Sequence, residues 1–92
     1  MEWEVVKSCR KNGWIAFRSA GSHSIVDVVA IDTKDMTVRL FQCKNKKMRQ
    51  SEVNREVNKI KSTGLHTCYK TVVYCYLVSG IEGEDRTRWT LV

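Results

Sequence analysis

The sequence predicts one small α/β domain, a mixed β-sheet flanked by helices, with the elements in the order α-β-β-β-α-β-β. Two segments carry apolar residues at helical spacing, and five shorter segments are continuously apolar or alternate between apolar and polar residues. Proline is absent, so glycines separate most of these segments. A length of 92 residues allows a single domain, residues 1–92.

The first half begins with a helix and continues with strands. Residues 2–12 predict a helix because Val5, Val6 and Cys9 share one face, and Gly13 suits the position just past its end. Three strands joined by short connections then predict a meander. In order, we expect a strand at residues 14–19, a loop at 20–24, a strand at 25–31, a turn at 33–35 and a strand at 37–44.

The second half predicts one helix and two strands. Ser51 suits the N-cap of the helix, Val53, Val57 and Ile60 recur at helical spacing, and Gly64 suits its end. Residues 72–78 form a strand that is apolar on both faces, so a helix or another subunit must cover each face. A turn at 81–85 leads to a last strand at 86–92.

The charge of the chain favours a polyanionic partner. The formal net charge is +6, and basic residues are concentrated after the third strand. Such a run is also typical of an ordinary solvated surface, but here it begins at a candidate catalytic lysine, which favours contact with phosphate. The basic residues of this segment are Lys44, Lys46, Lys47, Arg49, Arg55, Lys59 and Lys61.

The cysteines indicate a reducing compartment. The chain has four cysteines, without CxxC spacing, and its two histidines do not complete a zinc pattern. No signal-peptide pattern or apolar stretch of membrane-spanning length is present. We therefore expect a cytoplasmic protein with buried, reduced thiols and no membrane partner.

Polar residues in the second and third strands predict a metal site. Asp27 interrupts the apolar run IVDVVAI, and Gln42 and Lys44 share one face of the next strand. If these strands pair, the Asp27 carboxylate, the Gln42 amide oxygen and the backbone carbonyl of Cys43 would coordinate Mg²⁺ or Mn²⁺. Lys44 would orient the attacking water and stabilise charge on a phosphate. An ion pair between Asp27 and Lys44 alone is the simpler alternative.

The order and spacing of these and other residues resemble the PD-(D/E)xK nuclease superfamily, and within it the archaeal Holliday junction resolvases. The resemblance covers about half of the chain closely. It implies a restriction-endonuclease-like fold and a Mg²⁺-dependent endodeoxyribonuclease, with Mn²⁺ as a substitute, that cuts DNA four-way junctions as a homodimer. The matching residues are Glu2, Gly13-Trp14, Arg18 with the segment 19–22, Asp27 and Gln42-Cys43-Lys44.

The resemblance also implies roles for the outer residues. Glu2 would complete the metal site, directly or through water, although a carboxylate at a helix N-terminus is also favoured by the helix dipole. Arg18 would contact phosphate, and Ser22 would touch the DNA backbone near the cut; without the resemblance both are ordinary surface residues. Together with the strand residues and the basic run, this predicts the catalytic residues Glu2, Ser22, Asp27, Gln42 and Lys44 and the DNA-binding residues Arg18, Ser22, Lys46, Lys47, Arg49 and Arg55.

The main departure from the family pattern is Gln42, which replaces an acidic residue and removes one negative charge. Gln-x-Lys variants occur in the superfamily, notably among Mrr-like restriction nucleases, so we expect activity with weak metal binding. Val26 replaces the usual proline before the aspartate. Two alternatives remain open: a Mrr-like DNA endonuclease with another substrate, and a non-catalytic nucleic-acid-binding or regulatory protein on a degenerate nuclease fold.

Overall fold

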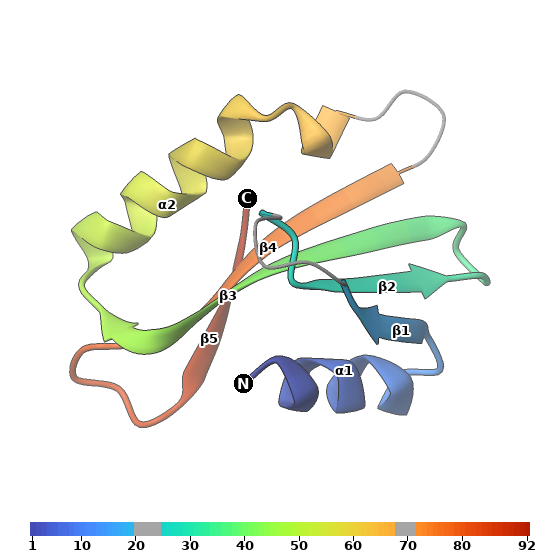
Figure 1. Ribbon diagram of the computed structural model, residues 1–92, viewed down its shortest axis with the longest axis horizontal. Coiled ribbons are helices and arrows are strands. Elements are labelled where there is room, and N and C mark those ends of the chain that lie inside the picture. Colours follow the sequence, from blue (N-terminus) through green and yellow to red (C-terminus); the bar gives the residue numbers. More distant parts are fainter. Residues whose placement is uncertain (20–24, 68–71) are drawn as a thin grey trace.

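A computed structural model describes residues 1–19, 25–67 and 72–92. A five-stranded sheet separates two helices that lie on its opposite faces (Figure 1). No helix in the described part of the chain is long and apolar enough to cross a membrane. The elements are α1 (Glu2–Lys11), β1 (Ile15–Arg18), β2 (Val28–Asp32), β3 (Thr37–Met48), α2 (Gln50–Ser62), the short 3₁₀ helix η1 (Leu65–Thr67), β4 (Val72–Ile81) and β5 (Thr87–Leu91).

The strands lie in the sheet in the order β1-β2-β3-β4-β5, which is also their order in the sequence. The first three form an antiparallel meander, as predicted. β3 and β4 are parallel, and α2 lies in the crossover that a parallel pair requires. β5 returns antiparallel to β4. The predicted mixed sheet flanked by helices, and the order α-β-β-β-α-β-β, are confirmed.

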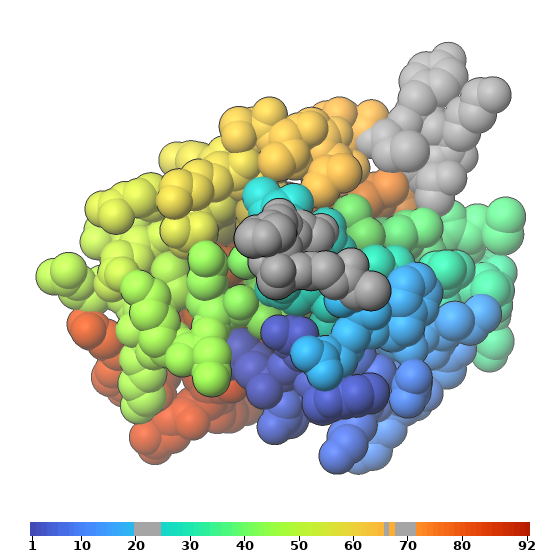
Figure 2. Space-filling model, in the orientation of Figure 1, coloured from blue at the N-terminus to red at the C-terminus, as the bar shows by residue number. Residues whose placement is uncertain are grey.

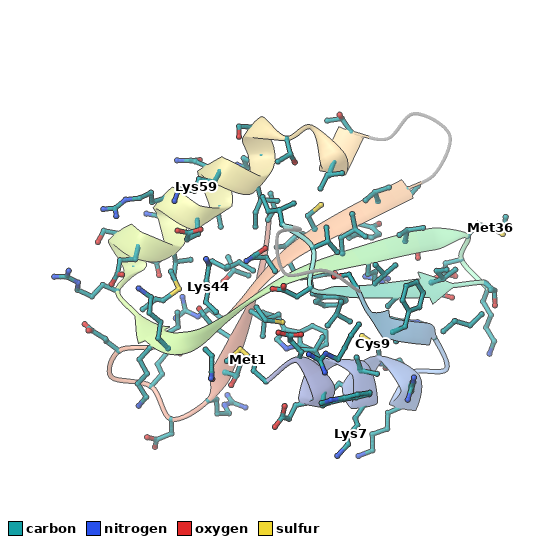
Figure 3. The ribbon with its side chains drawn as sticks, viewed as in Figure 1. Met1, Lys7, Cys9, Met36, Lys44 and Lys59 are labelled. Carbon is teal, nitrogen blue, oxygen red and sulfur yellow. The ribbon has the colours of Figure 1, made fainter. Side chains whose placement is uncertain are left out.

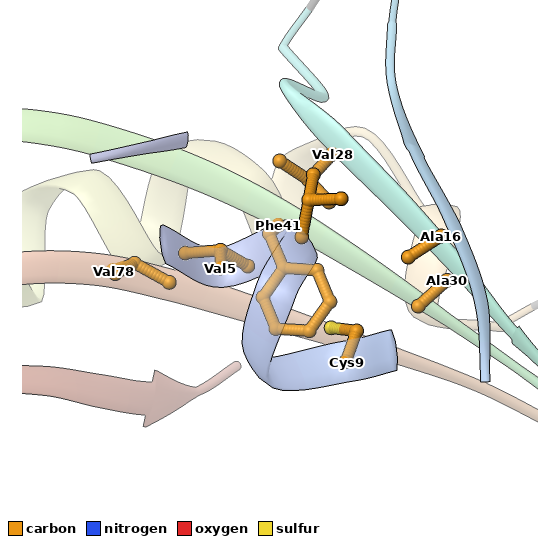
Figure 4. Packing of buried hydrophobic residues seen from close by; sticks show 8 residues of the cluster. Val5, Cys9, Ala16, Val28, Ala30, Phe41 and Val78 are labelled. Carbon is orange, nitrogen blue, oxygen red and sulfur yellow. The ribbon is translucent and has the colours of Figure 1, made fainter. Parts of the chain in front are cut away.

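The face of the sheet toward α1 holds an aromatic core. Phe41 is fully buried, and its ring stacks on that of Tyr76 with 5.1 Å between centroids. The Trp89 ring meets Phe41 edge-on at 5.0 Å. Val5 and Cys9 of α1 pack against this group, and Figure 4 shows Cys9 beside the Phe41 ring. The helical spacing seen in the sequence therefore marks the face of α1 that binds the sheet.

The opposite face packs against α2 through a second apolar cluster. Val53 and Ile60 of α2 meet Cys75 and Leu77 of β4 there. Helices thus cover both faces of β4. The face of the sheet toward α2 remains open over β1, where Ile15 and Phe17 are 57% and 47% exposed.

Three of the element boundaries that differ from the prediction have an identifiable structural cause. β2 begins at Val28 rather than Ile25. The Asp27 carboxylate accepts the hydrogen bond of the Cys43 backbone N–H, which would otherwise be free to pair with the backbone of β2. β3 continues to Met48 because its end pairs with β4. α2 has Arg49 rather than Ser51 at its N-cap, because the Glu52 carboxylate accepts the Arg49 backbone N–H.

Candidate active site

Asp27 is held between two strands at the start of β2. Its carboxylate Oδ2 accepts a hydrogen bond of 2.7 Å from the backbone N–H of Cys43. Its own backbone N–H donates to the carbonyl of Phe41 at 2.7 Å, and its carbonyl accepts from the N–H of Ser19 at 2.9 Å. These bonds to β3 and to the end of β1 place the carboxylate beside the segment 42–44.

Gln42 and Lys44 face α2. In the register of the parallel pair they lie beside Leu77 and Ser79, and Leu77 belongs to the cluster under α2. The amide oxygen of Gln42 is buried and has no hydrogen-bond partner among the described residues. An unpaired buried acceptor costs about 1–3 kcal/mol, so this oxygen is suited to a ligand that pairs with it.

Lys44 is paired with a residue that the sequence did not single out. Its Nζ lies 3.7 Å from Oε2 of Glu56 on α2, and Figure 3 places Lys44 on the side of β3 that faces this helix. In the described part of the chain the ion pair of Lys44 is therefore with Glu56, and the Asp27 carboxylate bonds to backbone instead. The simple Asp27–Lys44 pair is absent from this arrangement.

Cys43 points to the other face of β3 and packs against the α1-side core. Burial raises the pKa of its thiol to about 12, and the negative charges of Asp27 and then Glu2 add to that rise. Both carboxylates thus lie close enough to Cys43 to act on its titration. Asp27 and Glu2 come from different elements, and the charges of both act on this one thiol.

Glu2 and Arg18 contact each other. Arg18 Nε lies 3.1 Å from Glu2 Oε1, and the Arg18 guanidinium also stacks over the Trp3 ring at 5.3 Å. The pair joins the first turn of α1 to the end of β1. Ser22, the remaining predicted catalytic residue, lies outside the described residues.

Apart from Arg18, the predicted DNA-binding lysines and arginines lie at the end of β3, before α2 and on α2. Lys46, Lys47, Arg49 and Arg55 are all exposed. Figure 2 shows the end of β3 and the start of α2, coloured yellow-green, along one side of the face that also carries α1. Lys46 and Arg49 both pair with Glu52, at 3.2 and 3.5 Å. Exposed pairs of this kind are weak and exchange readily for a phosphate.

Sequence reasoning missed the polar groups under α2. Besides Gln42, the hydroxyl oxygens of Ser79 and Thr90 are buried without partners among the described residues. Glu56 had a usable signal, since it falls three residues after Val53 and four before Ile60, on the apolar face of the helix. Ser79 and Thr90 had none, because their burial depends on strand pairing.

Two further observations bear on the site. The described residues contain no group of three or more His, Cys, Asp and Glu arranged to hold a metal ion. A cavity of about 380 Å³ lies on the α1 side, and none of the candidate residues lines it. Its lining residues are Met1, Glu4, Val5, Ser8, Asn45, Val78, Thr87 and Trp89.

Comparisons with known proteins identify the fold. No protein-family model matches the chain, and no curated protein matches it either. Among solved structures, the chain is similar to Hjc from Archaeoglobus fulgidus, a Holliday junction resolvase from an archaeal hyperthermophile, with a TM-score of 0.54 and 18% sequence identity. The match covers 97% of this chain and 74% of that one. The chain therefore has a fold similar to that of this resolvase.

Proposed function

We propose that this protein is a metal-dependent DNA endonuclease that cuts branched DNA, specifically four-way junctions. The observation that carries the proposal is the hydrogen bond from the Cys43 N–H to Asp27, which holds a carboxylate against the Gln42-Cys43-Lys44 segment. The resolvase-like fold supports the same reading. Fold similarity at 18% identity does not specify an activity, so the site residues must carry the argument.

The donor atoms fit a hard divalent cation. Asp27, the Gln42 amide oxygen, the Cys43 carbonyl and Glu2 would hold Mg²⁺ or Mn²⁺, because these cations prefer oxygen ligands. The unpaired, buried Gln42 oxygen supports the fit. When bound, the metal would lower the pKa of a water and stabilise charge on the phosphate. Lys44 would orient that water, held in place by its ion pair with Glu56.

DNA binding would come from distributed positive charge. The chain has 16 lysines and arginines against 10 acidic residues. The exposed cations at the end of β3 and on α2 would neutralise backbone phosphates, so affinity should fall steeply with salt. The residues proposed for this contact are Arg18, Ser22, Lys46, Lys47, Arg49 and Arg55.

A homodimer is proposed from the open apolar face. On the face of the sheet toward α2, two rows of neighbouring residues run across the strands from β1 to β4. The rows begin on β1 at Ile15 and Phe17, which are about half exposed. A second copy would cover this surface and bring two active sites to one junction. The rows are Ile15, Ile31, Val38 and Val73, and Phe17, Val29, Leu40 and Cys75.

The test is cleavage of a labelled four-way junction and a sequence-matched linear duplex, each with and without Mg²⁺. Cleavage of the junction alone, lost in Asp27→Asn, supports the proposal. Equal cleavage of the duplex would favour a Mrr-like endonuclease. Binding without cleavage in either Mg²⁺ or Mn²⁺ would favour a non-catalytic DNA-binding protein, the reading that the neutral Gln42 keeps open.

A further inference from the structure

Helix α2 carries a carboxylate on the face that packs against the sheet. Val53 and Ile60 on this face are 0% and 4% exposed. Glu56 lies between them at the spacing that puts side chains on one side of a helix. Its side chain is only 20% exposed. A carboxylate at such a position is costly unless a specific partner compensates it.

The partner fixed by the sheet is Lys44. Glu56 Oε2 lies 3.7 Å from Lys44 Nζ, while Oε1 lies 3.3 Å from Nζ of Lys59. Lys59 is 63% exposed and sits one helical turn away, so this second contact is an ordinary surface pair. The Lys44 contact instead joins α2 to the strand that carries the candidate active site.

Glu52, one turn earlier on α2, provides an internal comparison. It also pairs with lysine and arginine and is 24% exposed. Its carboxylate, however, accepts the backbone N–H of Arg49 and so caps the helix. That structural role accounts for Glu52. Among the described residues, the contacts of Glu56 run to two lysine side chains, of which Lys44, at 33%, is less exposed than Lys59, at 63%.

The surroundings of Lys44 contain unused polar atoms. Ser79 lies beside Lys44 in the strand register, and its hydroxyl is fully buried without a partner in the described structure. The Gln42 oxygen on the same face is also unpaired. This partly buried region holds a carboxylate that is 20% exposed, a lysine that is 33% exposed and two buried, unpaired oxygens, and such a polar set is better suited to a cation and water than to apolar packing.

We propose that Glu56 is a further acidic residue of the active site, besides Asp27 and Glu2, and supplies, from α2, the negative charge that Gln42 does not bring. It holds Lys44 and takes part in binding the divalent cation. As a statement about catalysis this rests on the proposed nuclease function. As a statement about metal binding it stands on the contact between Glu56 and Lys44 and on the unpaired Gln42 oxygen, and it is tested separately.

The experiment measures Mn²⁺ affinity by calorimetry in the absence of DNA. The proteins are the wild type, Glu56→Gln, the matched control Glu52→Gln, and the double variant Gln42→Glu/Glu56→Gln. Glu56→Gln should weaken Mn²⁺ binding about tenfold or more, since loss of a supporting ligand typically costs 10–100-fold. Glu52→Gln, which retains an N3 capping side chain, should bind as the wild type does. The double variant should recover most of the affinity.

Junction cleavage by the same proteins separates this inference from the proposed function. If Mn²⁺ affinity depends on Glu56 but the wild type cuts no DNA, the nuclease proposal fails and the role of Glu56 in metal binding stands. If the wild type cuts DNA while Glu56→Gln binds Mn²⁺ unchanged, the inference is overturned and the nuclease function stands. Absence of Mn²⁺ binding by the wild type also overturns it. Thermal melting checks that each variant folds. If Glu56→Gln does not fold, Glu56→Asp replaces it in the measurement. Glu56→Asp should then bind Mn²⁺ with intermediate affinity, and wild-type affinity would contradict the inference.

Discussion

Glu2 and Arg18 form an ion pair in which the Arg18 Nε lies 3.1 Å from the Glu2 Oε1. The two residues are proposed for different tasks, one at the metal and one on DNA phosphate. Their side chains are 36% and 46% exposed, so the pair contributes little to stability. A phosphate that binds Arg18 would therefore release the Glu2 carboxylate toward Asp27 and Cys43 at low cost.

Arg18→Ala should weaken junction binding and make it less dependent on salt. Removing one phosphate contact is expected to reduce the slope of log K against log salt by about one. Fluorescence anisotropy with a labelled junction over a KCl series measures both quantities. Lys34→Ala, in the exposed turn between β2 and β3, is the control for lost charge alone. Equal effects of the two substitutions would show that Arg18 makes no specific contact.

Asp27→Asn and Lys44→Ala should each abolish Mg²⁺-dependent cleavage and leave junction binding largely intact. Asparagine keeps an oxygen that accepts the Cys43 N–H, so the local fold is retained while the charge is lost. Asp27→Ala removes the acceptor as well and should lower the free energy of unfolding by about 1–3 kcal/mol. Single-turnover cleavage and thermal melting distinguish these effects. Wild-type cutting by either of the first two variants would refute the site assignment.

The fold was predictable because its local signals agree with its packing. The spacing of Val5, Val6 and Cys9 predicted the buried face of α1, and all three are buried. Val53 and Ile60 did the same for α2. Strand ends were less predictable, because the last residues of β3 are held by pairing with Gly80 and Ile81, far away in the chain.

The candidate site was predictable only where strand neighbours define it. Alternation placed Gln42 and Lys44 on one face, and the meander placed Asp27 beside them. The ion pair of Lys44 was not predictable, because the position of α2 over β3 follows from tertiary packing. The position of Glu56 on the apolar face of its helix was visible in the sequence, but its contact with Lys44 emerged only from the structure.

Phe17→Lys should convert a homodimer into a monomer. Phe17 is 47% exposed on the open apolar face, so lysine is tolerated in a monomer but would be desolvated in an interface. Sedimentation at micromolar concentration should give twice 10.7 kDa for the wild type and 10.7 kDa for the variant. Leu91→Lys, at an exposed apolar residue of β5, is the control. A wild-type monomer would contradict the proposed interface.

The native protein should react slowly with thiol reagents through Cys9 and Cys43 near neutral pH. Burial raises the pKa of Cys9 to about 11 and, with the charges of Asp27 and Glu2, that of Cys43 to about 12. The native state therefore keeps these protons above pH 9, where the unfolded chain loses them, and stability should fall as the pH rises from about 9 toward 11–12. Denaturant unfolding over this range tests the direction; stability that rises with pH would contradict it.

Gln42→Glu should alter both stability and metal dependence. The Gln42 oxygen is buried and unpaired, so a carboxylate there is costly without a cation and should lower the melting temperature in the presence of chelator. A loss of about 1 kcal/mol corresponds to roughly 4–8 °C for a domain of this size. Because hard cations gain affinity from anionic ligands, Mn²⁺ or Mg²⁺ should restore the melting temperature, and half-maximal cleavage should require less Mg²⁺ than in the wild type.

In the wild type, Mn²⁺ should act at lower concentration than Mg²⁺, since it binds such sites more tightly and is less strict about geometry. A wild type inert with both metals whose activity appears with Gln42→Glu would favour the degenerate-nuclease reading. An active enzyme unchanged by the substitution would show that residue 42 does not bind the metal.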